Sequence, residues 1–129
     1  MHPVAVIDLN HFEPVAIEGF DLWMSRVALR HKSRLVAFTG RSRPILDFFL
    51  EHPGDEFSVR DVAIGIGLVQ PHWSMNLDKS YGEVTDTIVW LQSALLTLTG
   101  ETLLVNSNWL TGYERSFMLL NEAEGGDRE

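Results

Sequence analysis

The segment SYGEVTDTIVWLQSALLTLTG, residues 80–100, decides the fold class of this chain. At 100° per residue, its apolar residues fall within about 40° of one line along a helix. These residues are Val84, Ile88, Leu91, Leu95 and Leu98. Such a narrow apolar stripe predicts a helix over residues 83–99 that packs on a core.

Both ends of this helix carry terminal signals. Ser80 and Glu83 have the spacing of a capping box, in which each side chain satisfies a backbone N–H of the first turn. Gly100 supplies the residue that most often ends a helix in the left-handed conformation. The outward positions include one acid and no base, and they are Asp86, Val89, Trp90, Ser93 and Thr97.

A β-hairpin is predicted directly after this helix. Residues 102–105 form one β-prone run, residues 106–112 a loop rich in Asn, Ser and Gly, and residues 113–120 a second run. A long helix followed by a hairpin forms the second half of a winged helix-turn-helix.

The preceding part of the chain predicts a small sheet and two further helices. The runs 22–29 and 34–38 indicate a small antiparallel sheet. Pro44 fits the first turn of the next helix, which Pro53-Gly54 ends. Ser58 and Asp61 form a second capping-box pattern, and the helix that they open ends at Gly65 and Gly67. We therefore predict an α+β winged helix-turn-helix with an N-terminal antiparallel sheet, three helices and a C-terminal hairpin wing.

Residues 22–120 resemble the effector domain of OmpR/PhoB-type response regulators. Three matches carry the resemblance: the run from Phe38 through HPG at 52–54 to SVRDV at 58–62, the buried positions from Val84 to Leu95, and the segment from Leu104 to Tyr113. The resemblance implies a winged helix that acts on DNA or RNA polymerase, but no receiver domain is expected here. Trp90, Gln92 and Ser93 stand where that family usually places Arg or Lys in its recognition helix.

Length and composition predict one domain, residues 1–121, with a disordered acidic tail at 122–129. A chain of 129 residues that is 45% hydrophobic can bury a core that needs no disulfide or structural metal. The chain has no cysteine. No run is long and apolar enough to span a membrane, and no signal peptide is visible. We expect a cytoplasmic protein with no membrane partner.

The charge distribution singles out residues 24–43, the basic segment. The net charge is −8, which opposes unassisted binding to nucleic acid. The basic segment nevertheless has six cationic residues and no acid. Its candidate nucleic-acid contacts are Arg26, Arg30, Lys32, Arg34, Arg41 and Arg43. The alternative is a solvated face of the sheet with no binding role.

Large apolar residues at predicted surface positions are candidate protein contacts. Trp73, Met75 and Leu77 lie on the connection 68–82, which either folds back on the core or presents a docking surface. Val89, Trp90 and Trp109 lie on the helix face and the wing that usually meet DNA. Aromatic side chains there suit a protein interface better than a phosphate backbone.

Catalysis, metal binding and cofactor binding are not expected. The five histidines, His2, His11, His31, His52 and His72, lack metal-ligand spacing. Gly65-Ile-Gly67 lacks the third glycine of a dinucleotide fingerprint, and no Ser nucleophile has a supporting signature.

Two functional hypotheses remain. The first is a stand-alone winged-helix transcription regulator of bacterial or phage type that contacts DNA, RNA polymerase or both. The second is a winged-helix interaction module, a dimeriser or an inhibitor of a host protein, that has lost DNA readout by its third helix. A homodimer fits the second hypothesis.

Overall fold

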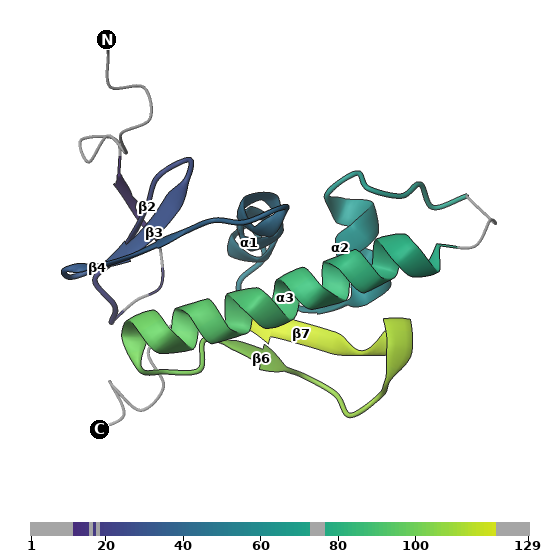
Figure 1. Ribbon diagram of the computed structural model, residues 1–129. Coiled ribbons are helices and arrows are strands. Elements are labelled where there is room, and N and C mark those ends of the chain that lie inside the picture. Colours follow the sequence, from purple (N-terminus) through teal and green to yellow (C-terminus); the bar gives the residue numbers. More distant parts are fainter. Residues whose placement is uncertain (1–11, 16, 18, 73–76, 121–129) are drawn as a thin grey trace, which may run out of the picture.

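The computed structural model describes residues 12–15, 17, 19–72 and 77–120 of the chain. This part is α+β, with three α-helices and two antiparallel sheets (Figure 1). The elements in chain order are β1 Glu13–Pro14, β2 Leu22–Met24, β3 Ala28–His31, β4 Arg34–Ala37, α1 Ser42–Leu50, β5 Glu56–Ser58, α2 Val59–Gly65, α3 Asp78–Thr99, β6 Leu104–Asn106, the 3-10 helix η2 Gly112–Glu114 and β7 Ser116–Leu119.

The N-terminal sheet is an antiparallel meander in the order β1-β2-β3-β4. The predicted strand over residues 22–29 is in fact two strands, because the chain turns at Ser25. The buried Ser25 hydroxyl accepts the backbone N–H groups of Val27 and Ala28, both at 3.1 Å. This serine turn supplies a hydrogen-bond acceptor for these two backbone N–H groups, and it lets β3 fold back on β2.

The second sheet has three strands in the order β5-β7-β6. The predicted hairpin is confirmed, since β6 pairs antiparallel with β7, but its second strand begins at Ser116 and not at Tyr113, which lies in η2. Strand β5 is an addition, which pairs Phe57 with Phe117 on the other side of β7. Only pairing with β7 makes residues 56–58 a strand, because the run is too short for an alternation pattern to show.

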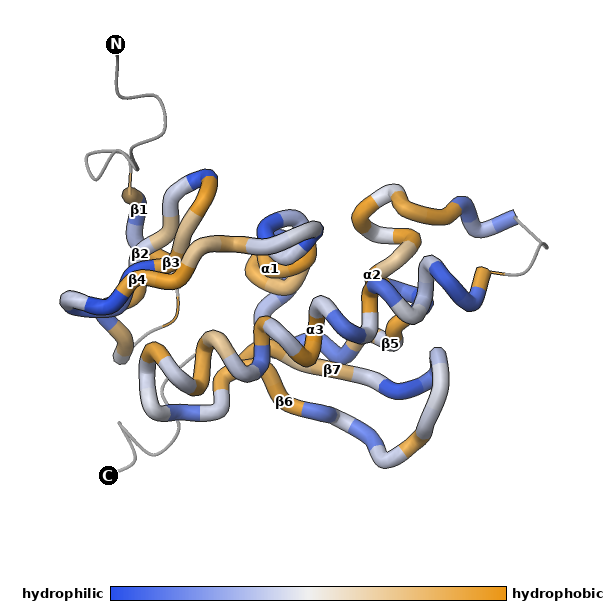
Figure 2. Tube along the Cα trace, in the orientation of Figure 1, coloured by the Kyte–Doolittle hydropathy of each residue, from blue (hydrophilic) through white to orange (hydrophobic). Residues whose placement is uncertain are grey.

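Helix α3 crosses the molecule, with the four-stranded sheet at its C-terminal end and α2 beside its N-terminal half (Figure 1). The predicted stripe is confirmed, because all five of its residues are buried in the common core. Figure 2 shows hydrophobic positions recurring along α3 between hydrophilic ones. Large core residues from the other layers pack here too, and these are Phe49 of α1, Val62 of α2 and Phe117 of β7.

Three of the predicted helix-end signals are confirmed. Gly100 ends α3 in the left-handed conformation, with φ 80°, and its N–H donates a hydrogen bond to the Leu96 carbonyl. Ser58 and Asp61 form the complete capping box of α2. Pro44 lies in the first turn of α1.

The predicted box at Ser80 is wrong. Helix α3 begins earlier, at Asp78, and no side chain caps it. The Glu83 carboxylate instead binds Arg41 of the connection before α1, at 2.8 Å. Because the helix starts two residues before Ser80, this serine lies inside it and cannot serve as its N-cap.

Several predictions fall outside the described residues. The acidic tail 122–129 lies there, as do Trp73 and Met75 of the connection before α3. Leu77, the last residue of that connection, is partly buried and packs against the core.

Candidate functional site

The loop between β6 and β7, residues 107–115, presents the most exposed large apolar side chain in the described part of the chain. Trp109 is 92% exposed, and Leu110 beside it is 51% exposed. Tryptophan is normally buried over most of its surface, since its ring is among the largest apolar groups in a protein. We call the pair Trp109 and Leu110 the loop tip.

A hydrogen-bond network centred on Asn108 holds this loop. The Asn108 amide nitrogen donates to the Glu114 carbonyl at 3.1 Å and to the Ser116 hydroxyl at 2.9 Å. Its amide oxygen accepts the N–H groups of Leu110 at 3.2 Å and Ser116 at 3.1 Å. One side chain thus ties both arms of the loop together, so Trp109 projects from a fixed backbone.

The far arm of the loop is anchored to α3 through Tyr113 of η2. The Tyr113 hydroxyl donates a hydrogen bond to the Asp78 carboxylate at 2.5 Å. The centroids of the Tyr113 and Tyr81 rings are 4.5 Å apart. This hydrogen bond raises the pKa of Tyr113 above its ordinary value of 10.0, because the protonated phenol is the donor. The loop is therefore fixed at both of its ends.

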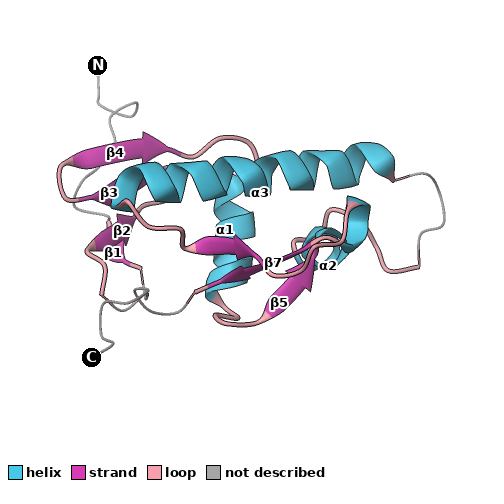
Figure 3. Cartoon of the chain, turned by 90° about the horizontal axis from the view of Figure 1, so that it is seen from below, coloured by secondary structure: helices cyan, strands magenta, loops and turns pink. Residues whose placement is uncertain are grey.

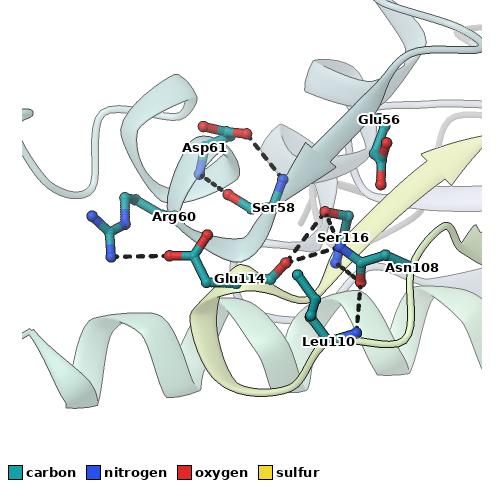
Figure 4. A pocket seen from close by; sticks show the side chains of 8 residues that line it. All are labelled: Glu56, Ser58, Arg60, Asp61, Asn108, Leu110, Glu114 and Ser116. Atoms are coloured by element: carbon teal, nitrogen blue, oxygen red, sulfur yellow. Dashed lines mark hydrogen bonds and ion pairs between the residues drawn. The ribbon is translucent and has the colours of Figure 1, made fainter.

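A shallow pocket of about 430 Å³ lies behind the loop tip, between the loop, β5 and the start of α2 (Figure 4). Its lining includes three carboxylates, those of Glu56, Asp61 and Glu114, and one base, Arg60. Arg60 pairs with Glu114 at 3.3 Å, and both side chains remain more than half exposed. The pocket is therefore net acidic.

The hydroxyls that line this pocket are structural. The Ser58 hydroxyl accepts the Asp61 N–H in the capping box, and the Ser116 hydroxyl binds Asn108 and Glu114. No histidine lines the pocket to activate either serine as a nucleophile. What this lining can do is hold polar or cationic groups by hydrogen bonds and charge.

Two residues of the basic segment are locked against α3. Arg34 donates to the Thr97 carbonyl at 2.6 Å, which satisfies a carbonyl of the last helical turn. Arg41 forms the ion pair with Glu83.

Two more are held within the N-terminal half. Arg43 binds Asp47 at 3.0 Å and the Ser25 carbonyl at 2.6 Å. The Arg30 guanidinium lies 5.4 Å from both the Phe12 and Trp23 rings. Of the six cations of the basic segment, only Arg26 and Lys32 have exposed side chains that make no hydrogen bond or ion pair with the described residues. Composition shows the positive charge of the segment but not these internal partners.

The prediction that Trp90 lies on the outward face of α3 is wrong. Trp90 lies at the flank of the helix, where it is partly buried and packs against the core. The exposed apolar residues are Val89, at 41%, and Leu96, at 46%, which are seven positions apart on one line. Gln92 on the other flank donates to the Leu104 carbonyl at 3.0 Å and to the Asn106 side chain at 2.9 Å.

Sequence reasoning identified Trp109 but missed Leu96, Leu110 and Asn108. Leu96 could have been found from its spacing with Val89, because seven residues return a helix to nearly the same direction. The signal for Asn108 is its position two residues before Leu110, a spacing typical of an Asx turn.

Comparisons with models of known protein families, with curated proteins and with solved structures find no match for this chain. In the part of the chain that the structure describes, no helix is long and apolar enough to cross a membrane. Nor does any group of three or more His, Cys, Asp or Glu side chains within the described ranges have an arrangement that could hold a metal ion.

Proposed function

We propose that this chain is a winged-helix protein that binds another protein through its loop tip. The observation that carries the proposal is the 92% exposure of Trp109 on a loop that the Asn108 network holds in place. An aromatic side chain on a fixed backbone has only two rotatable side-chain bonds and loses little conformational entropy on binding, and Trp is enriched at interface hot spots. The β6–β7 hairpin is the wing in this interpretation.

The order of elements supports the winged-helix part of the proposal. From α1 to β7 the chain runs helix, strand, helix, helix, strand, strand, with α2 packed on α3 and the hairpin beside α3. This order agrees with the resemblance to OmpR/PhoB-type effector domains in the sequence. In that family α3 would be the recognition helix.

The surface of α3 argues against sequence readout. Base recognition needs free bidentate donors, most often Arg for guanine and Asn or Gln for adenine. The outward residues Asp86, Val89 and Ser93 offer no such donor. The Gln92 amide, which could serve, is already bound to β6.

A second candidate function is transcription regulation through contacts with DNA or RNA polymerase. It is favoured by the free side chains of Arg26 and Lys32 and by the family resemblance. Protein binding ranks above it because four of the six cations of the basic segment already make internal contacts.

The test is quantitative capture from a lysate of the source cells by the immobilised full chain. Trp109→Ala should weaken retention of a specific protein about 30-fold, the loss expected for a hot spot of about 2 kcal/mol. Leu35→Ala is the matched control, since Leu35 is an exposed apolar residue of the N-terminal sheet. Equal retention by wild type and Trp109→Ala would refute the proposal.

A salt series with random duplex DNA completes this test. The protein-binding interpretation expects weak affinity and a shallow dependence on salt. A steep slope would instead favour the second candidate function.

A further inference from the structure

The outward face of α3 is uncharged over an unusual length for an exposed helix. From Thr87 to Gly100 the sequence has no Asp, Glu, Lys or Arg. Val89 and Leu96 project from this face, and the small Ser93 lies between them. Exposed helix faces normally carry charged residues, and in the described part of the chain the apolar side chains of this strip remain exposed.

The rest of the described chain leaves this strip open. Figure 3 shows α1, α2 and the three-stranded sheet on one side of α3, with β4 beside the C-terminal end of the helix. Gln92 fastens one flank of α3 to β6, and Arg34 of β4 fastens the other at Thr97. The strip between these two flanks faces solvent.

We propose that this strip binds a second copy of the chain, with the two α3 helices antiparallel and related by a two-fold axis. In the register that fits the strip, Val89 of each copy packs against Leu96 of the other. Seven residues separate them, or about 10.5 Å of helix, so both contacts form at once. A two-fold interface is self-complementary, so each favourable contact occurs twice.

Charge complementarity selects the antiparallel arrangement. A parallel pair, related by an axis along the helices, would bring the Asp86 flank of one copy against the Gln92 flank of the other, so Asp86 would not meet Arg34. In the antiparallel pair, a two-fold axis perpendicular to the helices brings the same flank of each helix together. Asp86 and Thr97 project within about 20° of each other, at 100° per residue, on one flank.

Arg34 completes this complementarity. Its guanidinium is fixed at that flank, 2.6 Å from the Thr97 carbonyl. In this register, Asp86 of one copy lies within about 3 Å, along the helix axis, of the level of Thr97 in the other. Each Asp86 therefore meets an exposed arginine of the second copy, whose guanidinium gives one hydrogen bond to the Thr97 carbonyl and has further N–H groups to donate. The β6–β7 loops of the two copies lie on the other flank, so both loop tips fall on one side of the dimer.

The first test is sedimentation equilibrium of the full chain from about 2 to 200 µM at low salt. We expect a monomer–dimer equilibrium. Leu96→Glu should raise the dissociation constant at least about 30-fold, because it places two carboxylates in the apolar contact. Val27→Glu, at a 51% exposed position on the β2–β3 turn, is the control and should leave the constant unchanged.

The second test is a charge exchange that is specific to the antiparallel register. Asp86→Arg and Arg34→Asp should each weaken the dimer about tenfold, and the double variant should recover most of that loss. Circular dichroism at each concentration confirms that the variants are folded, since Arg34→Asp also loses its bond to Thr97.

Three results would overturn the proposal. These are a monomer at 200 µM, equal effects of Leu96→Glu and Val27→Glu, or a double variant no tighter than the single ones. Trp109→Ala should keep the dimer intact, so failure of this interface and failure of partner binding at the loop tip are separate outcomes.

Discussion

Replacing Gly65 with alanine adds one methyl group where the structure has no room for it. Gly65 is the last residue of α2, and a Cβ built on it would lie 2.2 Å from Phe48 Cε1 and 2.9 Å from Phe48 Cζ. Real side chains do not approach this closely, so the Phe48 ring would have to move. That ring is held by neighbouring rings, with centroids 4.7 Å from Phe57 and 5.8 Å from Phe49.

The magnitude follows from two opposing effects. Exchanging Gly for Ala in a helix gains up to about 1 kcal/mol, and less at a helix end. Overpacking a fixed aromatic contact costs about 1–3 kcal/mol. We therefore expect Gly65→Ala to lower the free energy of unfolding by about 1–2 kcal/mol.

Gly82 offers a matched control in α3. A Cβ at Gly82 meets no heavy atom within 4 Å. Gly82→Ala should therefore raise the free energy of unfolding by about 0.5–1 kcal/mol, from helix propensity alone. The same exchange thus has opposite signs at two helical positions of one chain.

Urea unfolding followed by far-UV circular dichroism measures both effects. With a slope of about 2 kcal/mol per molar urea, Gly65→Ala should shift the midpoint down by about 0.5–1 M. Phe48→Leu removes the obstructing ring, so the cost of Gly65→Ala should shrink in that background. A Gly65→Ala variant as stable as Gly82→Ala would refute the reasoning.

Three further predictions follow from the loop and the basic segment. Asn108→Ala should cost about 1–2 kcal/mol in urea unfolding and speed proteolytic cleavage of residues 107–115, because the buried Ser116 N–H loses its acceptor. The phenol of Tyr113 should titrate above pH 10 in absorbance at 295 nm. Its hydrogen bond to Asp78 raises its folded pKa, so its stabilising effect holds below the unfolded pKa and is lost as pH rises through the folded one. Asp78→Asn should lower that pKa. Alanine at both Arg26 and Lys32 should flatten any log–log salt slope for DNA by about 2, since each free cation contributes about 0.9.

The sequence predicted those elements whose signals are local. The buried stripe of α3 repeats at the helical period over four turns, and no alternative structure buries those residues together. The Ser58 capping box and the Gly100 end depend on backbone groups within a few residues. Such signals are complete in the sequence before any tertiary contact forms.

Features that depend on distant partners could not be predicted. Strand β5 exists because β7 pairs with it, about 60 positions later in the chain. Glu83 has the spacing of a cap, but its carboxylate binds Arg41, which is 42 positions away. A one-dimensional pattern contains no information about which of two competing partners is closer in the fold.

The candidate site divides in the same way. Trp109 could be identified because a tryptophan in a polar loop stands out against its neighbours. Trp90 was assigned to the outward face from helical geometry, yet its ring reaches the core from the flank. Helical angles give the direction of a Cβ atom and not the resting place of a large ring.

The position of the arginines links these observations to function. A winged helix that binds DNA has unpaired cations on its recognition helix and wing, where they can displace counterions from phosphate. Here Arg34 and Arg41 instead hold α3 to the N-terminal half of the chain, and no base occurs on α3 after Lys79. Two apolar surfaces left open in the described part of the chain are the uncharged strip of α3 and the loop tip. Both are apolar, and both are supported by internal polar contacts that keep their shape. Such surfaces exclude water from a protein interface well and neutralise phosphate poorly, which is why we expect proteins, and not DNA, to bind to them.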